Sequence, residues 1–169
     1  MSTSSSVIEP PVFDSCDIVS KPRGKETSPL GYVTAPSTDI DTTHGLVFYY
    51  SYLTKESSVD AKTYGLGRPW HPTRTFSDGR YADPDAKGYT LYFHCYMDNH
   101  VYFWGKMSGK DKNGNKIWFY PFKNARFAEY KSTGPGAKVT SSYKRPQLSN
   151  SEAGKITLKN ILGGNWYKE

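Results

Sequence analysis

The segment Tyr64-Gly-Leu-Gly-Arg-Pro-Trp-His-Pro-Thr73 is the most informative stretch of this 169-residue chain. Its two glycines allow a sharp turn or a close approach to a neighbouring backbone, and its two prolines fix φ on either side of the tryptophan. Because Arg68 and Trp70 lie two residues apart on an extended segment, we expect both side chains on one face. Such a pair suits a carboxylate beside a sugar ring. The alternative is a buried ion pair next to a core tryptophan.

Short apolar and aromatic stretches recur on both sides of this segment. Those starting at Val12, Tyr32, Leu46 and Leu66 follow one another at intervals of 14 to 20 residues, with no amphipathic helix between them. This spacing favours a solenoid of parallel strands, in which each turn stacks on the last. The alternative is a β-sandwich, whose turns would recur about every 8 to 12 residues. The sequence therefore predicts an all-β solenoid.

Local signals predict the remaining elements. Strands are expected over residues 12–20, 31–36, 45–53 and 89–97, and residues 71–87 are expected to form a long ordered loop. Residues 101–104 and 117–120 flank a turn at Asn113-Gly114 and predict a hairpin. The capping box from Ser149 to Glu152 and the stop at Gly163-Gly164 predict one helix over residues 150–162, packed on the last strands. Trp166 is expected to anchor the tail.

The composition limits the choice of class. Aromatic residues make up 15% of the chain and include 14 tyrosines, which favours strands and one ordered domain over residues 12–169. Residues 1–11 are rich in serine and proline and are expected to be a disordered, unrelated lead-in. A formal charge of +6 predicts attraction to polyanions. The basic residues are scattered, so we expect no nucleic-acid-binding arm.

Other signals concern the compartment and the oxidation state. No apolar run approaches the roughly 18 residues of a membrane span, and the first residues have neither the basic nor the apolar region of a secretory signal. The compartment therefore stays unknown from the chain itself. Cys16 and Cys95 either pair or stay free, and the sequence does not choose between the two.

Rival chemistries have weak support in the sequence. His94, Cys95 and His100 are the closest group of metal-ligating residues, but they lack zinc-like spacing, and we expect no metal. A Ser/His/Asp triad needs only to meet in space, yet no Gly-x-Ser-x-Gly motif is present. The pair Gly65-x-Gly67 lacks the lysine and the helix of a phosphate loop.

From about Val12 to the end, the chain resembles the pectinesterases (pectin methylesterases) of bacterial type. The matching stretches are residues 64–73, Gly31-Tyr-Val-Thr-Ala-Pro-Ser37, Thr75-Phe-Ser-Asp-Gly-Arg-Tyr-Ala-Asp-Pro84, Met97-Asp-Asn-His100 and Lys106-Met-Ser-Gly-Lys-Asp-Lys-Asn-Gly-Asn115. The resemblance implies a right-handed parallel β-helix that hydrolyses the methyl esters of polygalacturonate, giving pectate and methanol, with no cofactor. It also implies a secreted, periplasmic or outer-membrane-associated protein.

The resemblance assigns roles to five residues. In that family an aspartate attacks the ester, a second aspartate is the general acid and base, glutamines bind the oxyanion, and an arginine binds the nucleophile. Arg68 matches this arginine, which would keep the nucleophile ionised. Trp70 matches the aromatic residue that faces the sugar. Thr73 and Met107 match further positions of the substrate cleft, and Arg23 matches a basic residue on its wall, in a loop that is shorter here.

The chain departs from the family in what it lacks. The family's two aspartates and its glutamines precede the segment that corresponds to Val12, and neither of their motifs occurs here; the one glutamine is Gln147. Asp14, Asp17 and Asp98 are the nearest acids, and we expect them to be solvated or turn-capping. The sequence therefore predicts the C-terminal portion of a β-helix, truncated at its N-terminal side and inactive as an esterase by itself.

Two further expectations follow. An open first solenoid turn exposes strand edges and predicts self-association or aggregation. The alternative functions are a non-catalytic binder of acidic polysaccharide and a gene fragment with no function of its own.

Overall fold

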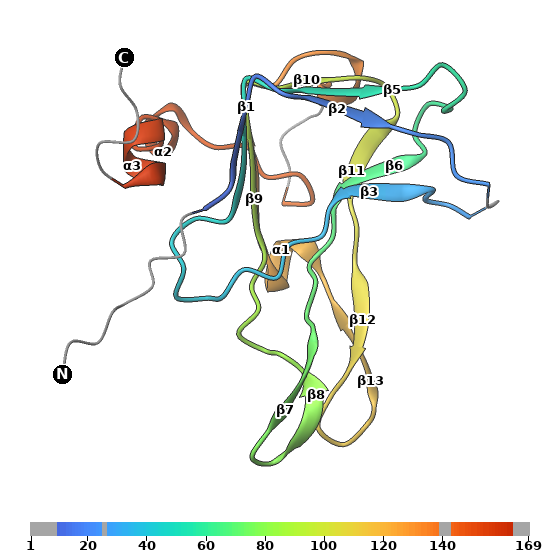
Figure 1. The fold of residues 1–169 in the computed structure, drawn as a ribbon, viewed down its shortest axis with the longest axis vertical. Helices are drawn as coiled ribbons and strands as arrows, with labels where there is room; N and C mark the ends of the chain where they lie inside the picture. Colours follow the sequence, from blue (N-terminus) through green and yellow to red (C-terminus); the bar gives the residue numbers. More distant parts are fainter. Residues whose placement is uncertain (1–9, 25–26, 139–142, 164–169) are drawn as a thin grey trace.

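The computed structural model describes residues 10–24, 27–138 and 143–163, and its strands coil into a parallel β-helix. Figure 1 looks along the coil, whose three sheets surround a common interior. Each turn contributes one short strand to each sheet, so strands far apart in the sequence lie side by side. The predicted parallel solenoid is confirmed.

Nine strands form the three complete turns. The first turn holds β1 (Val12–Asp14), β2 (Asp17–Ser20) and β3 (Gly31–Thr34); the second holds β4 (Leu46–Tyr49), β5 (Tyr52–Lys55) and β6 (Tyr64–Gly67); the third holds β9 (Tyr89–Phe93), β10 (Tyr96–Met97) and β11 (Val101–Trp104). Stacking gives the sheets β1-β4-β9-β14, β10-β5-β2 and β11-β6-β3, with β14 (Arg126–Tyr130) extending the first. All neighbours in these sheets are parallel.

A sharp corner follows each strand of the first sheet. One residue there has a positive φ: Ser15 at 53°, Tyr50 at 48°, His94 at 53° and Lys131 at 44°. None of these is a glycine, and the left-handed conformation is unfavourable for most of them. The predicted continuous strands over 12–20, 45–53 and 89–97 are therefore wrong in one respect, because each bends at this corner into two strands.

Small side chains next to the corners satisfy the backbone there. The Ser51 hydroxyl accepts a hydrogen bond from the Cys16 amide at 3.1 Å and donates to the Phe13 carbonyl at 2.8 Å. In the next turns, the Ser132 hydroxyl accepts from the Cys95 amide at 3.3 Å. Because these donors and acceptors lie inside the coil, the side chains replace the ladder bonds that a bend interrupts.

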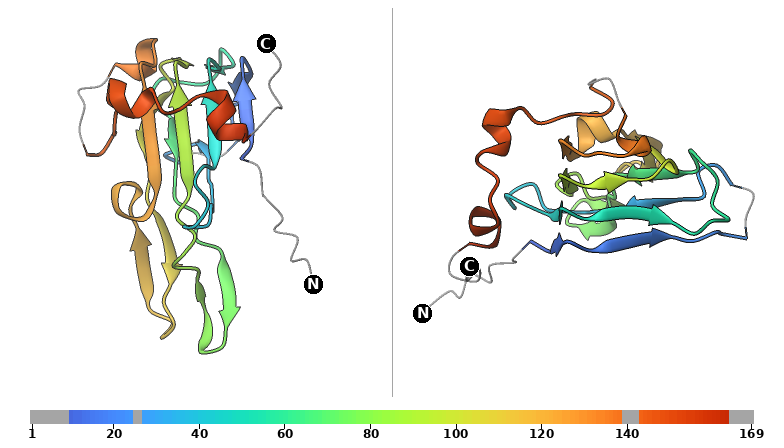
Figure 2. Two further views of the ribbon diagram at one scale, coloured as in Figure 1. Left: turned by 90° about the vertical axis from the view of Figure 1, so that its left-hand side faces the viewer. Right: turned by 90° about the horizontal axis from the view of Figure 1, so that it is seen from above.

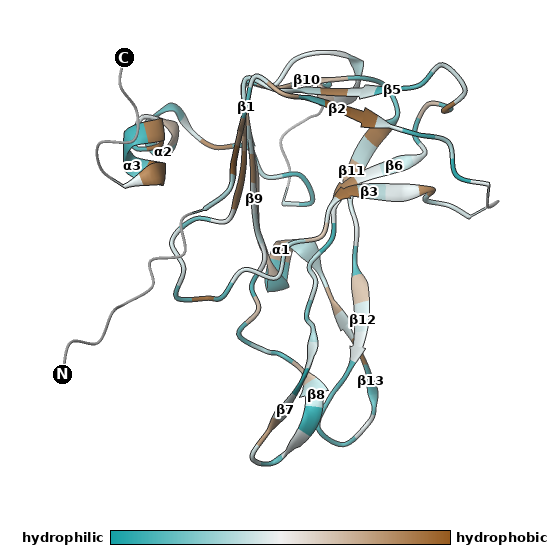
Figure 3. Ribbon diagram, in the orientation of Figure 1, coloured by the Kyte–Doolittle hydropathy of each residue, from teal (hydrophilic) through white to brown (hydrophobic). Residues whose placement is uncertain are grey.

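Aromatic rings stacked from turn to turn fill the interior. Phe13, Phe48 and Tyr92 lie opposite one another in the first sheet, with ring centroids 4.7 and 4.9 Å apart. The buried Tyr92 hydroxyl donates to the Leu66 carbonyl at 2.8 Å, so its polar end is satisfied. In Figure 3 hydrophobic residues gather along β1 and β2, while most connecting loops are hydrophilic.

Two antiparallel hairpins leave the same region of consecutive turns and lie side by side (Figures 1 and 2). They are β7 (Thr73–Phe76) with β8 (Gly79–Ala82), and β12 (Met107–Lys110) with β13 (Lys116–Phe119). The first lies inside the predicted loop 71–87. In the second hairpin the predicted turn at Asn113-Gly114 is correct, but the predicted partner strand is wrong. Residues 101–104 form β11 of the coil, and β12 pairs with β13 instead.

The C-terminal segment covers the outer face of the first sheet. Helices α2 (Asn150–Ala153) and α3 (Leu158–Leu162) place Ala153 and Ile161 against Val47 and Leu91. The predicted capping box at Ser149 is present, but the single helix is not. The chain leaves the helix at Gly154 and starts again at Thr157, whose side chain accepts from the Asn160 amide. Gly164 and Trp166 lie outside the described residues.

Two other short helices complete the described chain, α1 (Pro121–Asn124) and η1 (Pro135–Ala137). None of the described helices has the length and apolar character that crossing a bilayer requires.

Candidate functional site

Arg68 directly follows β6, whose four residues are buried. Its amide donates to the Thr34 carbonyl at 3.2 Å, which continues the pairing between the first and second turns. Its guanidinium lies over the Tyr32 ring, 4.9 Å from the ring centroid. The Arg68 Nε is buried and has no hydrogen-bond partner, and no carboxylate of the described residues forms an ion pair with this side chain. A buried donor without a partner is costly, so this atom lacks an acceptor that residues outside the described ones could supply.

Arg68 and Arg23 line the same cavity. It has a volume of about 410 Å³ and also contacts Tyr32 and Thr34. Arg23 is exposed and uses its Nη1 to donate to the Leu30 carbonyl at 3.4 Å. Two guanidinium groups on one wall, with none of the described acids paired to either, favour an anionic ligand such as a carboxylate.

Trp70 lies on the other side of the buried Pro69. Its ring is 45% exposed and lines a separate cavity of about 590 Å³, together with Arg74 and His44. Arg68 and Trp70 thus border two neighbouring cavities instead of one. The Trp70 amide donates to the Pro36 carbonyl at 3.0 Å, which holds the backbone of this segment against the first turn.

Thr73 and Met107 begin the two projecting hairpins. Thr73 is exposed at the start of β7, and Met107 is half-buried opposite Phe119 at the start of β12. The hairpins adjoin through β8 and β12, where a Cβ on Gly109 would lie 2.9 Å from the Cβ of Ala82. Thr73 thus lies beyond β6 and Met107 beyond β11, in hairpins that adjoin each other.

The buried histidines His71 and His100 have partners within the fold. His71 stacks on Phe119 at 3.6 Å, its Nδ1 lies 2.6 Å from the Asp83 carbonyl oxygen, and burial lowers its pKa. Burial also lowers the pKa of His100, whose Nε2 lies 3.0 Å from the Ser20 hydroxyl. Among the described residues, no three His, Cys, Asp or Glu side chains gather as metal ligands do.

The three candidate acids are engaged at strand ends, away from Arg68. Asp14 accepts from the Ser15 hydroxyl at 3.0 Å, Asp17 from the Thr54 hydroxyl at 2.5 Å, and Asp98 from the Asn99 amide at 2.6 Å. These are the turn-capping and surface contacts that the sequence predicts for them.

Both cysteines are free. Cys16 and Cys95 occupy equivalent positions two turns apart, with Ser51 between them, which places their backbones roughly 10 Å from each other, too far for a disulfide. Burial raises the pKa of the Cys95 thiol from its ordinary 9.0 to about 12. The buried Cys95 thiol is thus not arranged as a nucleophile.

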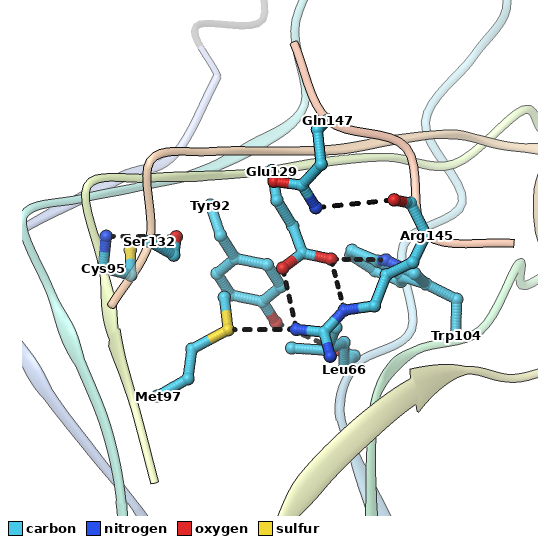
Figure 4. Close-up of polar contacts among 9 residues, drawn as sticks. All are labelled: Leu66, Tyr92, Cys95, Met97, Trp104, Glu129, Ser132, Arg145 and Gln147. Atoms are coloured by element: carbon cyan, nitrogen blue, oxygen red, sulfur yellow. Dashed lines mark hydrogen bonds and ion pairs between the residues drawn. The ribbon is translucent and has the colours of Figure 1, made fainter. Parts of the chain in front are cut away.

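A buried ion pair is the strongest polar feature that the sequence analysis missed (Figure 4). Glu129 lies opposite Tyr92 in the first sheet and points into the coil. Arg145 binds its two carboxylate oxygens at 2.7 and 2.8 Å, and the Trp104 indole donates to one of them at 3.2 Å. Glu129 is 1% exposed and Arg145 is 6% exposed, so this pair belongs to the interior of the fold, although Arg145 also borders a cavity of about 500 Å³. The signal in the sequence is a charged residue at a strand position that Phe13, Phe48 and Tyr92 fill in the other turns.

The fold and the site define a parallel β-helix protein with a cationic cavity suited to an acidic ligand. No family model matches the chain. Pectinesterase A of Dickeya chrysanthemi is 56% identical over 155 residues, 90% of this chain and 42% of the relative. The pectin methylesterase structure from Yersinia enterocolitica has 50% identity and a TM-score of 0.87, covering 92% of this chain and 48% of its own. The structure of a pectin methylesterase in complex with a hexasaccharide has 54% identity and a TM-score of 0.85, and the match covers 92% of this chain and 45% of its own.

The resemblance of this chain to bacterial pectinesterases is therefore confirmed. The chain spans less than half of the length of the relatives that it matches, which fits the predicted portion of such an enzyme.

Proposed function

We propose that this chain forms the arginine-bearing part of a pectin methylesterase, in which Arg68 binds and orients a catalytic aspartate supplied by other residues of the enzyme. The observation that carries the proposal is the buried, unpartnered Nε of Arg68 beside an open cavity. A fixed guanidinium lowers the pKa of an adjacent carboxylate and so keeps a nucleophilic aspartate ionised. The complete enzyme would hydrolyse methyl esters of polygalacturonate, outside the cytoplasm where pectin lies.

Four further residues would contact the polymer. The exposed ring of Trp70 would pack on a sugar, with Thr73 and Met107 beyond it on the two hairpins. Arg23 would bind a free carboxylate from the wall of the Arg68 cavity. The 169 residues tested alone should release no methanol from esterified pectin, because the described residues offer no nucleophile beside Arg68.

A chimera tests the proposal most directly. The upstream part of pectinesterase A from Dickeya chrysanthemi, joined to this chain, should release methanol from esterified pectin. In this chimera Arg68→Ala should lower kcat by about a hundredfold or more, the usual cost of removing a preorganised charge next to the reacting groups. Lys159→Ala is the matched control, since it removes an exposed cation from α3. Full activity of the Arg68→Ala chimera contradicts the proposed role.

A non-catalytic binder of acidic polysaccharide is the second candidate. The exposed Trp70 and the two arginines of one cavity, Arg23 and Arg68, favour it, because they need no nucleophile to hold a uronate chain. An active chimera decides for the esterase. An inactive, folded chimera whose binding of polygalacturonate is lost on Trp70→Ala decides for the binder.

A further inference from the structure

The outer face of the β12–β13 hairpin carries aromatic rings and lysines that the proposed site does not use. Directly opposite residues in an antiparallel pair share a face, so the pair Met107 and Phe119 faces one side and the pair Ser108 and Trp118 faces the other. Phe119 is buried, whereas Trp118 is 42% exposed. The face with Trp118 is thus turned away from the face with Met107.

Lysines cover the exposed rings on this face. The Lys106 Nζ lies 4.2 Å from the Trp118 ring centroid and 5.9 Å from that of Tyr120, and the Lys116 Nζ lies 4.7 Å from Trp118. Cation–π contacts hold an ammonium group over a ring but leave its N–H donors free for an anion. None of the described acids forms an ion pair with these lysines or with Lys144. We call this set of rings and lysines the hairpin patch: Lys106, Lys116, Trp118, Tyr120, Phe122 and Lys144.

The hairpin patch borders a hollow large enough for a ligand. A cavity of about 500 Å³ is lined by Tyr102, Phe103, Lys106, Tyr120, Phe122 and Lys144, among others. Tyr120 and Phe122 are exposed on its rim, with their ring centroids 5.6 Å apart. Flat apolar rings beside unpaired ammonium groups suit a ligand that presents both apolar faces and negative charges.

This cavity adjoins the Arg68 site. Phe103 lines the cavity, and its ring centroid is 5.9 Å from that of Tyr32, the ring under the Arg68 guanidinium. The Tyr32–Phe103 contact therefore connects the lining of the Arg68 cavity with that of the cavity beside the hairpin patch, within the span of a single polymer chain. This continuity favours a uronate polysaccharide over an unrelated anion.

We propose that the hairpin patch is a second binding surface for the same class of acidic polysaccharide, which takes de-esterified stretches of the chain through Trp118, Lys106 and Lys116. Sugar faces pack on Trp118 and Tyr120, and the uronate carboxylates accept hydrogen bonds from the ammonium groups. The choice of substrate class rests on the proposed function. The location of the patch rests on the contacts above.

The test separates the two surfaces. In a chain carrying Arg68→Ala and Trp70→Ala, calorimetry should still detect binding of de-esterified oligogalacturonate, and added salt should weaken it. Adding Trp118→Ala should raise Kd by about tenfold or more, and adding Lys106→Gln should raise Kd and reduce the salt dependence. Tyr52→Ala removes a ring of comparable exposure, 51% against 42% for Trp118, from β5 and should change nothing. Trp118→Phe, which keeps an aromatic ring, should retain most of the binding.

Three results overturn the proposal. These are no binding in the Arg68→Ala, Trp70→Ala background, equal binding with and without Trp118, and tighter binding of a single-stranded polynucleotide than of the uronate. Each leaves the proposed function standing, because methanol release by the chimera measures that independently.

Discussion

The Arg68 Nε is a polar atom that the described fold leaves unsatisfied, so this donor contributes no hydrogen bond to the stability of the chain. We expect Arg68→Met to change the free energy of unfolding by less than about 1 kcal/mol, since removing a buried donor with no acceptor offsets the loss of the cation–π contact with Tyr32. Urea unfolding of the isolated chain measures this. A loss of more than about 1 kcal/mol would mean that the guanidinium already has an internal role.

Arg145 provides the opposite case. Arg145→Met leaves the Glu129 carboxylate buried without its cation, and breaking a buried pair in this way costs about 3–5 kcal/mol. The same urea experiment should therefore separate the two arginines clearly. Such a contrast is what we expect if Arg145 serves the fold and Arg68 serves the proposed site.

Cys95 should be chemically silent in the folded chain. Burial raises its pKa to about 12, so its thiolate does not form near neutral pH. At about pH 8 a thiol reagent should label the half-buried Cys16 and reach Cys95 only after unfolding. The raised pKa favours the protonated thiol in the folded state, so this residue's contribution to stability is complete below pH 9.0 and falls as the pH rises towards about 12. Rapid labelling of both thiols in native buffer contradicts the prediction.

At the scale of elements, glycines in β6 allow the turns to stack closely. A Cβ on Gly67 would collide with the Thr34 hydroxyl and lie 2.8 Å from the Trp104 ring. We expect Gly67→Ala to destabilise the chain by about 1–3 kcal/mol, because the ring and the strand must both shift. Thermal unfolding measures the loss. Gly24→Ala is the control, since a Cβ added at Gly24 would meet no atom within 4 Å.

Elements whose signals are local could be predicted from the sequence, and those set by stacking could not. The capping box at Ser149 and the turn at Asn113-Gly114 depend on a few neighbouring residues, and both are present. The bends at Tyr50 and His94 follow no turn motif, because packing against the adjacent turns imposes the positive φ. The β7–β8 hairpin had a signal, the Asp78-Gly79 pair after alternating residues, which the length of the supposed loop obscured.

Part of the candidate site could also be predicted from the sequence, and part could not. Arg68 lines a cavity and has no acidic partner among the described residues, while its predicted role as the partner of a nucleophile stays a prediction. The assignment of Arg68 and Trp70 to one face rested on strand alternation, but β6 ends at Gly67, and the proline that follows Arg68 redirects the chain. Alternation applies only inside a strand.

The whole molecule has two different ends. No described strand pairs with the outer edges of β1, β2 and β3, so three rows of backbone groups are open at the N-terminal end. We expect the isolated chain to self-associate through this end, with a sedimentation coefficient that rises with concentration.

Val19→Pro tests which edge is involved. The carbonyls of Cys16 and Ser20 accept hydrogen bonds from the amides of Tyr52 and Glu56, so the backbone of these two residues faces β5. Because successive residues of a strand face opposite sides, the Val19 amide points to the open edge. Proline at this position removes a donor there without breaking the pairing of β2 with β5. The variant should stay monomeric at concentrations where the parent associates. A monodisperse parent chain contradicts the prediction outright.

The opposite end is closed by the Glu129–Arg145 pair. Residues beyond β14 already pair with its outer edge, through the bonds from the Glu129 amide to Pro146 and from the Leu148 amide to Glu129. Any extra coil added there would have to displace a desolvated carboxylate and its guanidinium. We therefore expect the solenoid to accept a further coil on the open edges of β1, β2 and β3 but not past β14, so that it can lengthen in one direction only.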